Sequence, residues 1–560
     1  YTTSLMSNSE IHYLDAHSKT TESTGYCSCE PEPLPGLQKL AALLLERPLD
    51  TFLRRHAIKR FGALAPRETA ALLDEAVTEE GGRAVAQGFL AELAAIYPVY
   101  CVGFPDLSAG SVTEKSASPL VTLRRQAFPD AGLHAAWGAI FRQNAHTHRS
   151  LRSLDFSRLD PLYPDPPPVE SVSLTLPEAY QHLAGRMRAL PEAPVTAPAE
   201  VAELALERLR ECGVVAGAEQ RHLASLSPVG LLMPWRLEVR VNSGRHRYRL
   251  SGETNTYGRG LTVDRARASC RMEMVERASA YLSVQGGVVE NREVPLTLRR
   301  DRLSALLAGG AAALDPNSGH LEAPYADEEL YWLEAERLTG NPAGGTESVS
   351  EPVWVPFQAV SLFPNLDEVD LCSAPGSTGL ASGLSLEQAK LAALTEILER
   401  DTEATTIYDK SRCFVLQAGE STPSQLAELL EDYARLGVNV QFMDMTGPLG
   451  IPCYKCFVLG PRGSVHAGYG AGLSGGRAII SALTETPYPY PSGGPSGPRL
   501  RNLPVRKYGE LPDYSLGGVS ADLRLLEGFL CANGLTPVYI RLTRADLHLP
   551  VVRAIIPGMQ

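Results

Sequence analysis

The feature that most constrains this 560-residue chain is an internal duplication. Residues 260–277 read GLTVDRARASCRMEMVER, and residues 383–400 read GLSLEQAKLAALTEILER, so the two segments align without a gap. Both end in Glu-x-x-Glu-Arg: Glu273, Glu276 and Arg277 in the first copy, and Glu396, Glu399 and Arg400 in the second. A solvated charged face explains one such helix, but it gives no reason for the pattern to recur in register. We therefore interpret the pair as a functional site.

Helical spacing places the charged groups of each copy on one face, because residues three and four apart are neighbours on a helix surface. Ser269, four residues before Glu273, joins the face of the first copy. A third and weaker copy is GLSGGRAIISALTETPY, in which Gly472, Ala478 and Glu485 keep the spacing. There, Tyr488 and Pro489 stand where the second acid and the arginine would be.

Two facing helices of this kind would bring four carboxylates together, and each would raise the pKa of the others. Cations relieve such repulsion, and oxygen ligands favour Mg²⁺. Mg²⁺ takes only one or two carboxylates and fills its other positions with water or phosphate oxygens. Arginines add fork-shaped donors for phosphate. The residues thus predict a Mg–nucleotide site carried on helices, and the chain has no G-x-x-x-x-G-K-[ST] motif of a P-loop.

These segments also resemble the signature segments of the YcaO family. The resemblance rests on Ser269-x3-Glu273-x2-Glu276-Arg277, on the preceding TYGRGLT and on STGLASGLSLEQAKLAALTEILERD, and it extends to LYWLEAERLTGNP and VWVPFQAVSLF between them. It covers roughly residues 170–560. It implies an ATP-binding fold unrelated to P-loops, in which the glutamates hold Mg²⁺ while the serine and the arginines meet the phosphates.

The resemblance implies a function as well. Members of the family phosphorylate the oxygen of a peptide backbone amide, after which a nucleophile adds to the amide carbon and phosphate leaves. The product is an azoline when the nucleophile is a neighbouring side chain and a thioamide when it is external sulfide. Other members are named as accessory factors for methylthiolation of a ribosomal protein. The main hypothesis is therefore a Mg²⁺- and ATP-dependent enzyme that modifies a peptide or protein backbone, and the alternative is an ATP-binding accessory factor.

The candidate residues follow from the motifs and the resemblance together. Metal ligands are expected at Glu273, Glu276, Glu396 and Glu399; catalytic cations at Arg277 and Arg400; and nucleotide contacts at Ser269, Glu387, Arg400 and Glu485. The sequence departs from the family pattern in having GRG at 258–260 in place of GKG, and a helix-breaking TETPYPYP after the third copy. Arg499 or Arg501 could supply the cation absent there. The chain ends AIIPGMQ without a Pro-x-Pro-x-Pro tail, which shifts the expectation away from azoline formation.

Composition changes along the chain predict four parts and an α+β fold. Residues 1–34 are polar and read as a flexible arm. Residues 35–160 carry Leu/Ala-rich stripes at helical spacing, which predict an all-α domain that could form its own core, bind a partner or mediate self-association. Residues 161–172 are a proline-rich linker. In residues 173–560, strands and helices mix in the order expected of an α+β ATP-binding domain with internal pseudo-repeats.

Net charge, hydropathy and cysteine content indicate where the chain is located and which partners it has. A net charge of −12 argues against nucleic acid as a partner. Without a run of about 18 apolar residues or a signal-peptide pattern, a membrane location is not expected. The 10 scattered cysteines fit a reduced, cytoplasmic protein. Expected partners are a peptide or protein substrate, a sulfur-delivery or peptide-presenting protein, and a second copy in a homodimer.

Two other motifs have simpler explanations. Cys453-x-x-Cys456 could be half a zinc site or a redox pair, but IPCYKCFVLG reads as a buried strand, so structural cysteines are predicted. Gly470-x-Gly472-x-x-Gly475 matches a dinucleotide-binding fingerprint. The internal repeat accounts for the same glycines better.

Overall fold

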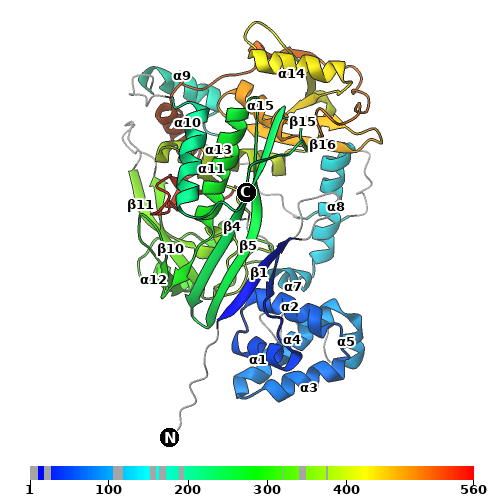
Figure 1. The fold of residues 1–560 in the computed structure, drawn as a ribbon, viewed down its shortest axis with the longest axis vertical. Coiled ribbons are helices and arrows are strands. Elements are labelled where there is room, and N and C mark those ends of the chain that lie inside the picture. Colours follow the sequence, from blue (N-terminus) through cyan, green and yellow to red (C-terminus); the bar gives the residue numbers. More distant parts are fainter. Residues whose placement is uncertain are drawn as a thin grey trace.

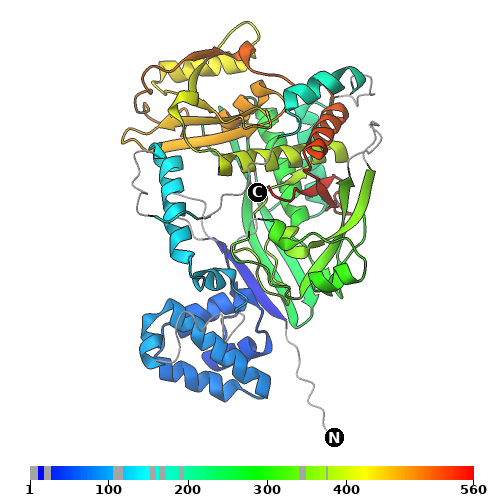
Figure 2. The same ribbon diagram turned by 180° about the vertical axis from the view of Figure 1, so that it is seen from behind.

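The computed structural model describes residues 10–17, 27–104, 118–151, 159–162, 172–187, 195–319, 321–339, 349–373 and 376–559. These residues form the predicted α+β fold. A helical body lies at the bottom of Figure 1, and three β-sheets with their helices make up the rest. The view from behind shows the same division (Figure 2).

The segment predicted to be all-α is helical in the parts that the structure describes. Its helices are α1 (Leu37–Glu46), α2 (Thr51–Phe61), α3 (Pro66–Ala76), α4 (Glu80–Ile96), α5 (Pro98–Gly103), α7 (Val121–Gln126) and α8 (Ala131–Thr147). Asp50 begins α2 by accepting a hydrogen bond from the backbone N–H of Leu53, and Pro66 occupies the first turn of α3. The apolar stripes are core, with Leu40, Leu44 and Phe89 fully buried. Helix α8 extends from this body to the neighbourhood of β16 (Figure 1).

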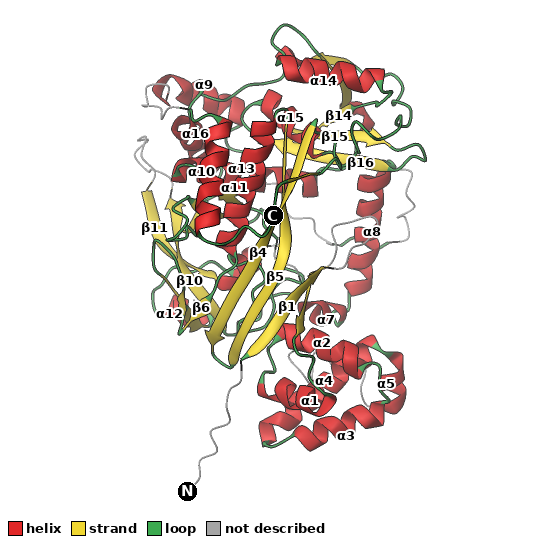
Figure 3. Ribbon diagram, viewed as in Figure 1, coloured by secondary structure: helices red, strands yellow, loops and turns green. Residues whose placement is uncertain are grey.

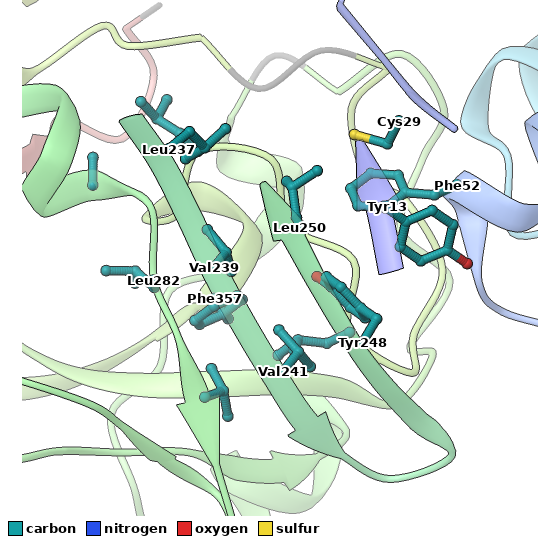
Figure 4. Packing of buried hydrophobic residues seen from close by; sticks show 14 of the residues in the cluster. Tyr13, Cys29, Phe52, Leu237, Val239, Val241, Tyr248, Leu250, Leu282 and Phe357 are labelled. Carbon is teal, nitrogen blue, oxygen red and sulfur yellow. The ribbon is translucent and has the colours of Figure 1, made fainter. Parts of the chain in front are cut away.

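The prediction of a flexible arm is wrong for two parts of residues 1–34. Strands β1 (Ile11–His17) and β2 (Cys27–Pro31) pair with each other, and β1 runs parallel to β5. Tyr13 is fully buried and meets the rings of Phe52 and Tyr248 edge-on (Figure 4). The segment is polar on average, but one buried aromatic ring and a parallel strand pairing are enough to order it. The predicted linker at 161–172 lies largely outside the described residues.

The first sheet has the order β2-β1-β5-β4-β6-β7-β8, with β3 paired to β4. The strands not yet given are β3 (Gln220–Arg221), β4 (Val229–Ser243), β5 (His246–Gly260), β6 (Val284–Gln285), β7 (Val288–Val289) and β8 (Leu296–Thr297). Long strands β4 and β5 form a hairpin, and the second half of β4 alternates buried and exposed residues as a sheet with one covered face should. Figure 3 shows this hairpin crossing the middle of the molecule.

Two further sheets complete the fold. The second has the order β11-β10-β18-β19-β12, with β9 paired to β10, and the third has the order β16-β15-β14-β13-β17. Their strands are β9 (Arg299–Asp301), β10 (Leu330–Thr339), β11 (Val349–Pro356), β12 (Leu380–Ser382), β13 (Cys413–Gln417), β14 (Gln441–Asp444), β15 (Cys453–Leu459), β16 (Val465–Ala471), β17 (Val505–Lys507), β18 (Val538–Arg541) and β19 (Val551–Ile555). The remaining helices are α9 (Leu176–Met187), α10 (Pro198–Glu211), α11 (Val263–Ala280), α12 (Leu303–Ala308), α13 (Leu386–Thr405), α14 (Ser424–Arg435), α15 (Gly475–Glu485) and α16 (Val519–Ala532).

Each copy of the sequence repeat is a strand followed by a helix, and each strand belongs to a different sheet. The units are β5–α11, β12–α13 and β16–α15, and the three helices group in the centre of the molecule (Figure 1). Glycine permits the close contact between strand and helix. A Cβ on Gly258 would lie 2.1 Å from the carbonyl oxygen of Ala266, and one on Gly470 would lie 2.2 Å from that of Ala478. These two pairs occupy equivalent repeat positions, which supports the repeat as the reason for the third set of glycines.

The cysteine pair on β15 is structural, as predicted. Cys453 and Cys456 are both buried, and they belong to hydrophobic clusters on opposite faces of the strand. Their side chains therefore point away from each other and cannot share a metal ion.

The glycine contact gives a direct test of the packing of α15 on β16. In Gly470→Ala the new methyl group would meet backbone atoms of α15 at 2.2 and 2.7 Å, which can be relieved only by separating helix and strand. We expect a loss of about 1–3 kcal/mol in the free energy of unfolding, measured by chemical denaturation. Gly419→Ala, where a Cβ would meet nothing within 4 Å, is the matched control and should change stability by less than about 0.5 kcal/mol. Equal stability of both variants would contradict the packing described.

Candidate functional site

The three strand–helix units bring five glutamates into one acidic cluster: Glu273 and Glu276 on α11, Glu396 and Glu399 on α13, and Glu485 at the end of α15. Their electrostatic interactions form a closed series. Glu276 interacts with Glu273 and Glu396, Glu399 interacts with Glu396 and Glu485, and Glu485 interacts with Glu273. The duplicated motifs thus face each other, as the sequence predicted.

The two glutamates of α11 are held by few partners. Glu273 accepts a hydrogen bond of 2.9 Å from the backbone N–H of Tyr257 on β5. The ion pairs of Arg277 with Glu273 and Glu276 are loose, at 3.6 and 3.7 Å. Burial raises the pKa of Glu273, and it raises that of Glu276 well above the ordinary value, although Arg277 opposes both shifts.

Burial also raises the pKa of the two glutamates of α13. Burial raises the pKa of Glu396 to about 7, with Glu399 adding to the shift and Arg400 opposing it. Burial and the neighbouring Glu485 raise the pKa of Glu399 to about 7. Glu399 accepts a hydrogen bond of 3.1 Å from the backbone N–H of Ala471, the last residue of β16. This bond joins the second repeat unit to the third.

The third repeat unit contributes to the cluster despite its weak sequence match. Helix α15 ends at Glu485, and Pro487 follows two residues later, so no second acid or arginine can continue on the helix. Burial raises the pKa of Glu485, which is also affected by Arg259 and Arg400. Two cations therefore act on Glu485: Arg259 of the GRG segment on β5, which has the larger effect, and Arg400 of α13. Arg499 and Arg501 are exposed on a surface loop.

Four guanidinium groups are distributed around the acids. Arg400 donates a hydrogen bond of 2.9 Å to Glu403 and lies 3.9 Å from Glu399. Burial lowers the pKa of Arg553, on β19, to about 10, while Glu396 and Glu276 oppose that shift. Together with Arg277 and Arg259, these groups surround the carboxylates without pairing fully with any of them. The arrangement leaves both donors for an anion and oxygen ligands for a cation.

The chemistry of this donor set fits Mg²⁺ bound together with phosphates. Within the described ranges, no three acidic, histidine or cysteine groups are close enough to share a single metal ion. The carboxylates approach each other as neighbours in a series, which suits ions that each take one or two carboxylates and share phosphate oxygens. Bound Mg²⁺ ions would remove the repulsion between the carboxylates, which favours binding of the metal.

The other predicted site residues are placed differently. Ser269 lies on α11 four residues before Glu273, with its side chain exposed. Glu387 is exposed in the first turn of α13, nine positions before Glu396, and thus on the opposite side of the helix from that residue. The structure brings Glu485, Arg277 and Arg400 to the acidic cluster.

Two arginines of the site were not predicted from the sequence. Arg259 is visible in the sequence as the departure from GKG, and a cation beside the first glycine of a repeat could have indicated a site residue. Arg553 lies in LPVVRAIIP, where a lone charge inside a buried apolar strand indicates a specific partner. Its partners come from α11 and α13, far away in the sequence, so the sequence alone could not name them.

Comparison with known proteins identifies the domain that contains the acidic cluster. Residues 257–487 match the family model described as YcaO cyclodehydratase, ATP- and Mg²⁺-binding. An uncharacterized protein of Methanothermobacter thermautotrophicus is 28% identical over 342 residues, which cover 54% of this chain and 81% of that protein. Residues 257–487 thus form a YcaO-type domain, and ATP and Mg²⁺ are its cofactors.

Two solved structures are similar over part of the fold. A heterocyclase in complex with substrate and cofactor has a TM-score of 0.47 and 18% identity, over 67% of this chain and 55% of that one, so this chain spans little more than half of it. The YcaO protein of Methanopyrus kandleri, bound with AMPPCP and Mg²⁺, has a TM-score of 0.45 and 20% identity, over 65% of this chain and 91% of that one. Among the helices that the structure describes, none combines the length and apolarity that a membrane crossing requires.

The raised pKa of Glu399 predicts a gain in stability when its charge is removed. An unfolded glutamate has an ordinary pKa near 4.5, but burial raises the pKa of Glu399 in the folded protein to about 7. The free energy of unfolding therefore falls as the pH rises from about 4.5 to about 7, and it stays at the lower value above that range. In the absence of nucleotide and at about pH 8, Glu399→Gln should therefore have a free energy of unfolding about 1–3 kcal/mol higher than that of the wild type. Thermal unfolding should show this gain as a higher midpoint. At about pH 4 the two should be equal.

The matched control is Glu428→Gln, on the exposed face of α14, which should follow the wild type at both pH values. A destabilised Glu399→Gln protein at high pH would show that the carboxylate is a needed structural partner rather than a strained one.

Proposed function

We propose that the chain is an enzyme that uses Mg·ATP to activate a backbone amide of a peptide or protein, so that a nucleophile can replace the amide oxygen. One observation carries the proposal: three repeat units converge to bury five carboxylates whose charges are not neutralised within the protein. A purely structural role would pair these acids. Buried, unneutralised carboxylates cost stability, and such a cost is typical of functional sites.

In this proposal, the four glutamates of the two full repeat copies bind the metal. Glu273 and Glu276 would hold Mg²⁺ from α11, and Glu396 and Glu399 would hold it from α13. Glu485 is the one acid that the third unit retains, and Glu485, Ser269 and Glu387 remain candidates for direct contact with the nucleotide. The backbone N–H groups of Tyr257 and Ala471 orient Glu273 and Glu399, which fixes the direction of their free oxygens.

Charge stabilisation falls to the arginines. Arg277 and Arg400 follow directly after the second acid of each copy, and they would donate hydrogen bonds to the phosphates of a bound nucleotide. ATP supplies the phosphoryl group that turns an amide oxygen, a poor leaving group, into a good one. Catalysis of such a transfer is mainly positioning and charge neutralisation, which Arg277, Arg400 and the bound metals would provide.

The nucleophile decides which product forms. Attack by a neighbouring side chain of the substrate would give an azoline, and attack by sulfide would give a thioamide. A sulfur-delivery protein or a peptide-presenting protein would then be the partner. The accessory-factor alternative, in which the chain binds ATP but performs no peptide chemistry of its own, is separated from both by the next test.

Replacing one metal ligand should abolish turnover without unfolding the protein. Glu396→Gln removes a ligand charge but keeps shape and volume, so we expect ATP hydrolysis in the presence of a library of short peptides to fall by at least about 100-fold. Circular dichroism should stay native-like, and the thermal midpoint should be no lower than that of the wild type, because burial raises the pKa of Glu396 as it does that of Glu399. Mass spectrometry of the peptides should show loss of water for an azoline, or exchange of oxygen for sulfur when sulfide is added. ATP turnover without any peptide product would favour the accessory factor, and normal turnover by Glu396→Gln would contradict the site.

Nucleotide affinity should depend on pH with a defined sign. Glu396 and Glu399, each with a pKa of about 7, must lose their protons to bind Mg²⁺. The affinity for Mg·AMPPCP should therefore rise as the pH rises from about 6 to about 8, and level off above that range. Titration calorimetry in two buffers of different ionisation enthalpy should show proton release on binding near neutral pH. An affinity that is constant over this range would exclude these two carboxylates as ligands.

A further inference from the structure

A cavity of about 400 Å³ borders the site but contains none of the five glutamates in its wall. The wall is mainly apolar and includes Leu314, Pro316, Leu321, Leu371, Ile397 and Ile556. It also contains Arg553, which interacts electrostatically with Glu276 and Glu396 of the acidic cluster. Its volume lies within the range of pockets that bind small organic groups.

Arg553 is fixed in this wall by the backbone of the wall itself. Its Nε donates to the carbonyl oxygen of Ala359 at 3.0 Å, and its Nη2 donates to that of Gly376 at 2.9 Å. Both of these residues also line the cavity. The side chain is only 8% exposed, and its Nη1 has no hydrogen-bond partner among the described residues. A buried charged donor without an acceptor is costly, so a ligand that brings an acceptor to this N–H group would relieve that cost.

The charge of the surroundings selects the kind of acceptor. Arg553 interacts electrostatically with Glu276 and Glu396, so an anionic ligand at Arg553 would compete with these two carboxylates for its charge. A neutral carbonyl oxygen accepts a charge-assisted hydrogen bond without that competition. The apolar wall, in turn, favours a hydrophobic group attached to the carbonyl.

From these contacts we infer that the cavity receives an apolar side chain of the peptide substrate, while Arg553 donates a hydrogen bond to the adjoining backbone carbonyl. This inference rests on the proposed function, because it assigns that function its substrate subsite. Ile397, in the cavity wall, follows Glu396 directly on α13. A carbonyl held by Arg553 thus lies beside the metal-binding acids, where an amide must lie to be phosphorylated. Arg553 is a specificity-determining residue in this arrangement, and the enzyme prefers a bulky apolar residue next to the reacting amide.

The test uses a minimal peptide probe on the full chain with Mg·AMPPCP present. N-acetyl-leucine N-methylamide carries one apolar side chain between two amides, and N-acetyl-glycine N-methylamide is its counterpart without the side chain. Saturation-transfer NMR should show binding of the leucine probe to the wild type, and binding of the glycine probe that is at least about tenfold weaker. No detectable binding of the leucine probe, or equal binding of both probes, would overturn the inference.

Two variants locate the binding. Ala359→Leu fills the cavity from a half-buried wall position and should weaken the leucine probe by at least about tenfold. Ala427→Leu, half-buried on α14 and outside the cavity, is the matched control and should bind as the wild type does. Arg553→Lys keeps the charge but loses the planar fork, and should weaken both probes. Thermal midpoints identify any variant that fails to fold. Unchanged binding in folded Ala359→Leu would overturn the assignment of the cavity.

Failure of this subsite assignment can be distinguished from failure of the proposed function. Probe binding is read without ATP turnover, and binding of Mg·AMPPCP by the wild type is measured separately by calorimetry. Loss of peptide chemistry with specific probe binding would leave a peptide-binding cavity on a protein that is not an amide-activating enzyme. Nucleotide binding and turnover without specific probe binding would leave the proposed function and remove this subsite.

Discussion

Repulsion between buried carboxylates is the interaction on which the rest of this structure depends. Five glutamates from three helices interact in a closed series, and the four arginines near them neutralise the charge only in part. The protein must therefore position its helices by packing that is strong enough to oppose this repulsion. Glycines such as Gly258 and Gly470 allow each helix to lie directly on its strand, and the backbone N–H groups of Tyr257 and Ala471 hold two of the acids.

The sequence was informative where chemistry repeats locally. Identical spacing in two segments was enough to predict that Glu273, Glu276, Glu396 and Glu399 would come together, and helical periodicity was enough to predict the helical body. Contacts between residues that are distant in the chain could not be predicted in this way. Arg553 reaches the cluster from β19, and Tyr13 orders a polar segment by burying one ring between α2 and β5. The predicted roles of Ser269 and Glu387 remain proposals, because their exposed side chains show no contact that assigns them.

The third repeat unit shows how a weak motif can keep a function. It retains the glycines and one acid, because these positions set the packing and the charge, and it loses the arginine once proline ends the helix. Arg259, from the strand of the first unit, lies close enough to act on Glu485 instead. The positive charges that act on Glu485 thus come from the other two repeat units and not from its own helix. A search by sequence pattern would miss this arrangement, since the charges come from other parts of the chain.

The distribution of the repeat units over three sheets has a consequence for biosynthesis. Glu273 and Glu485 are separated by some two hundred residues, and Arg553 lies further still towards the carboxyl end. A growing polypeptide on the ribosome can fold its helical body and its long hairpin early, but it cannot assemble the acidic centre until nearly all of the chain has emerged. Truncated products of translation consequently lack the centre altogether, and they should be inert towards nucleotide instead of hydrolysing it unproductively.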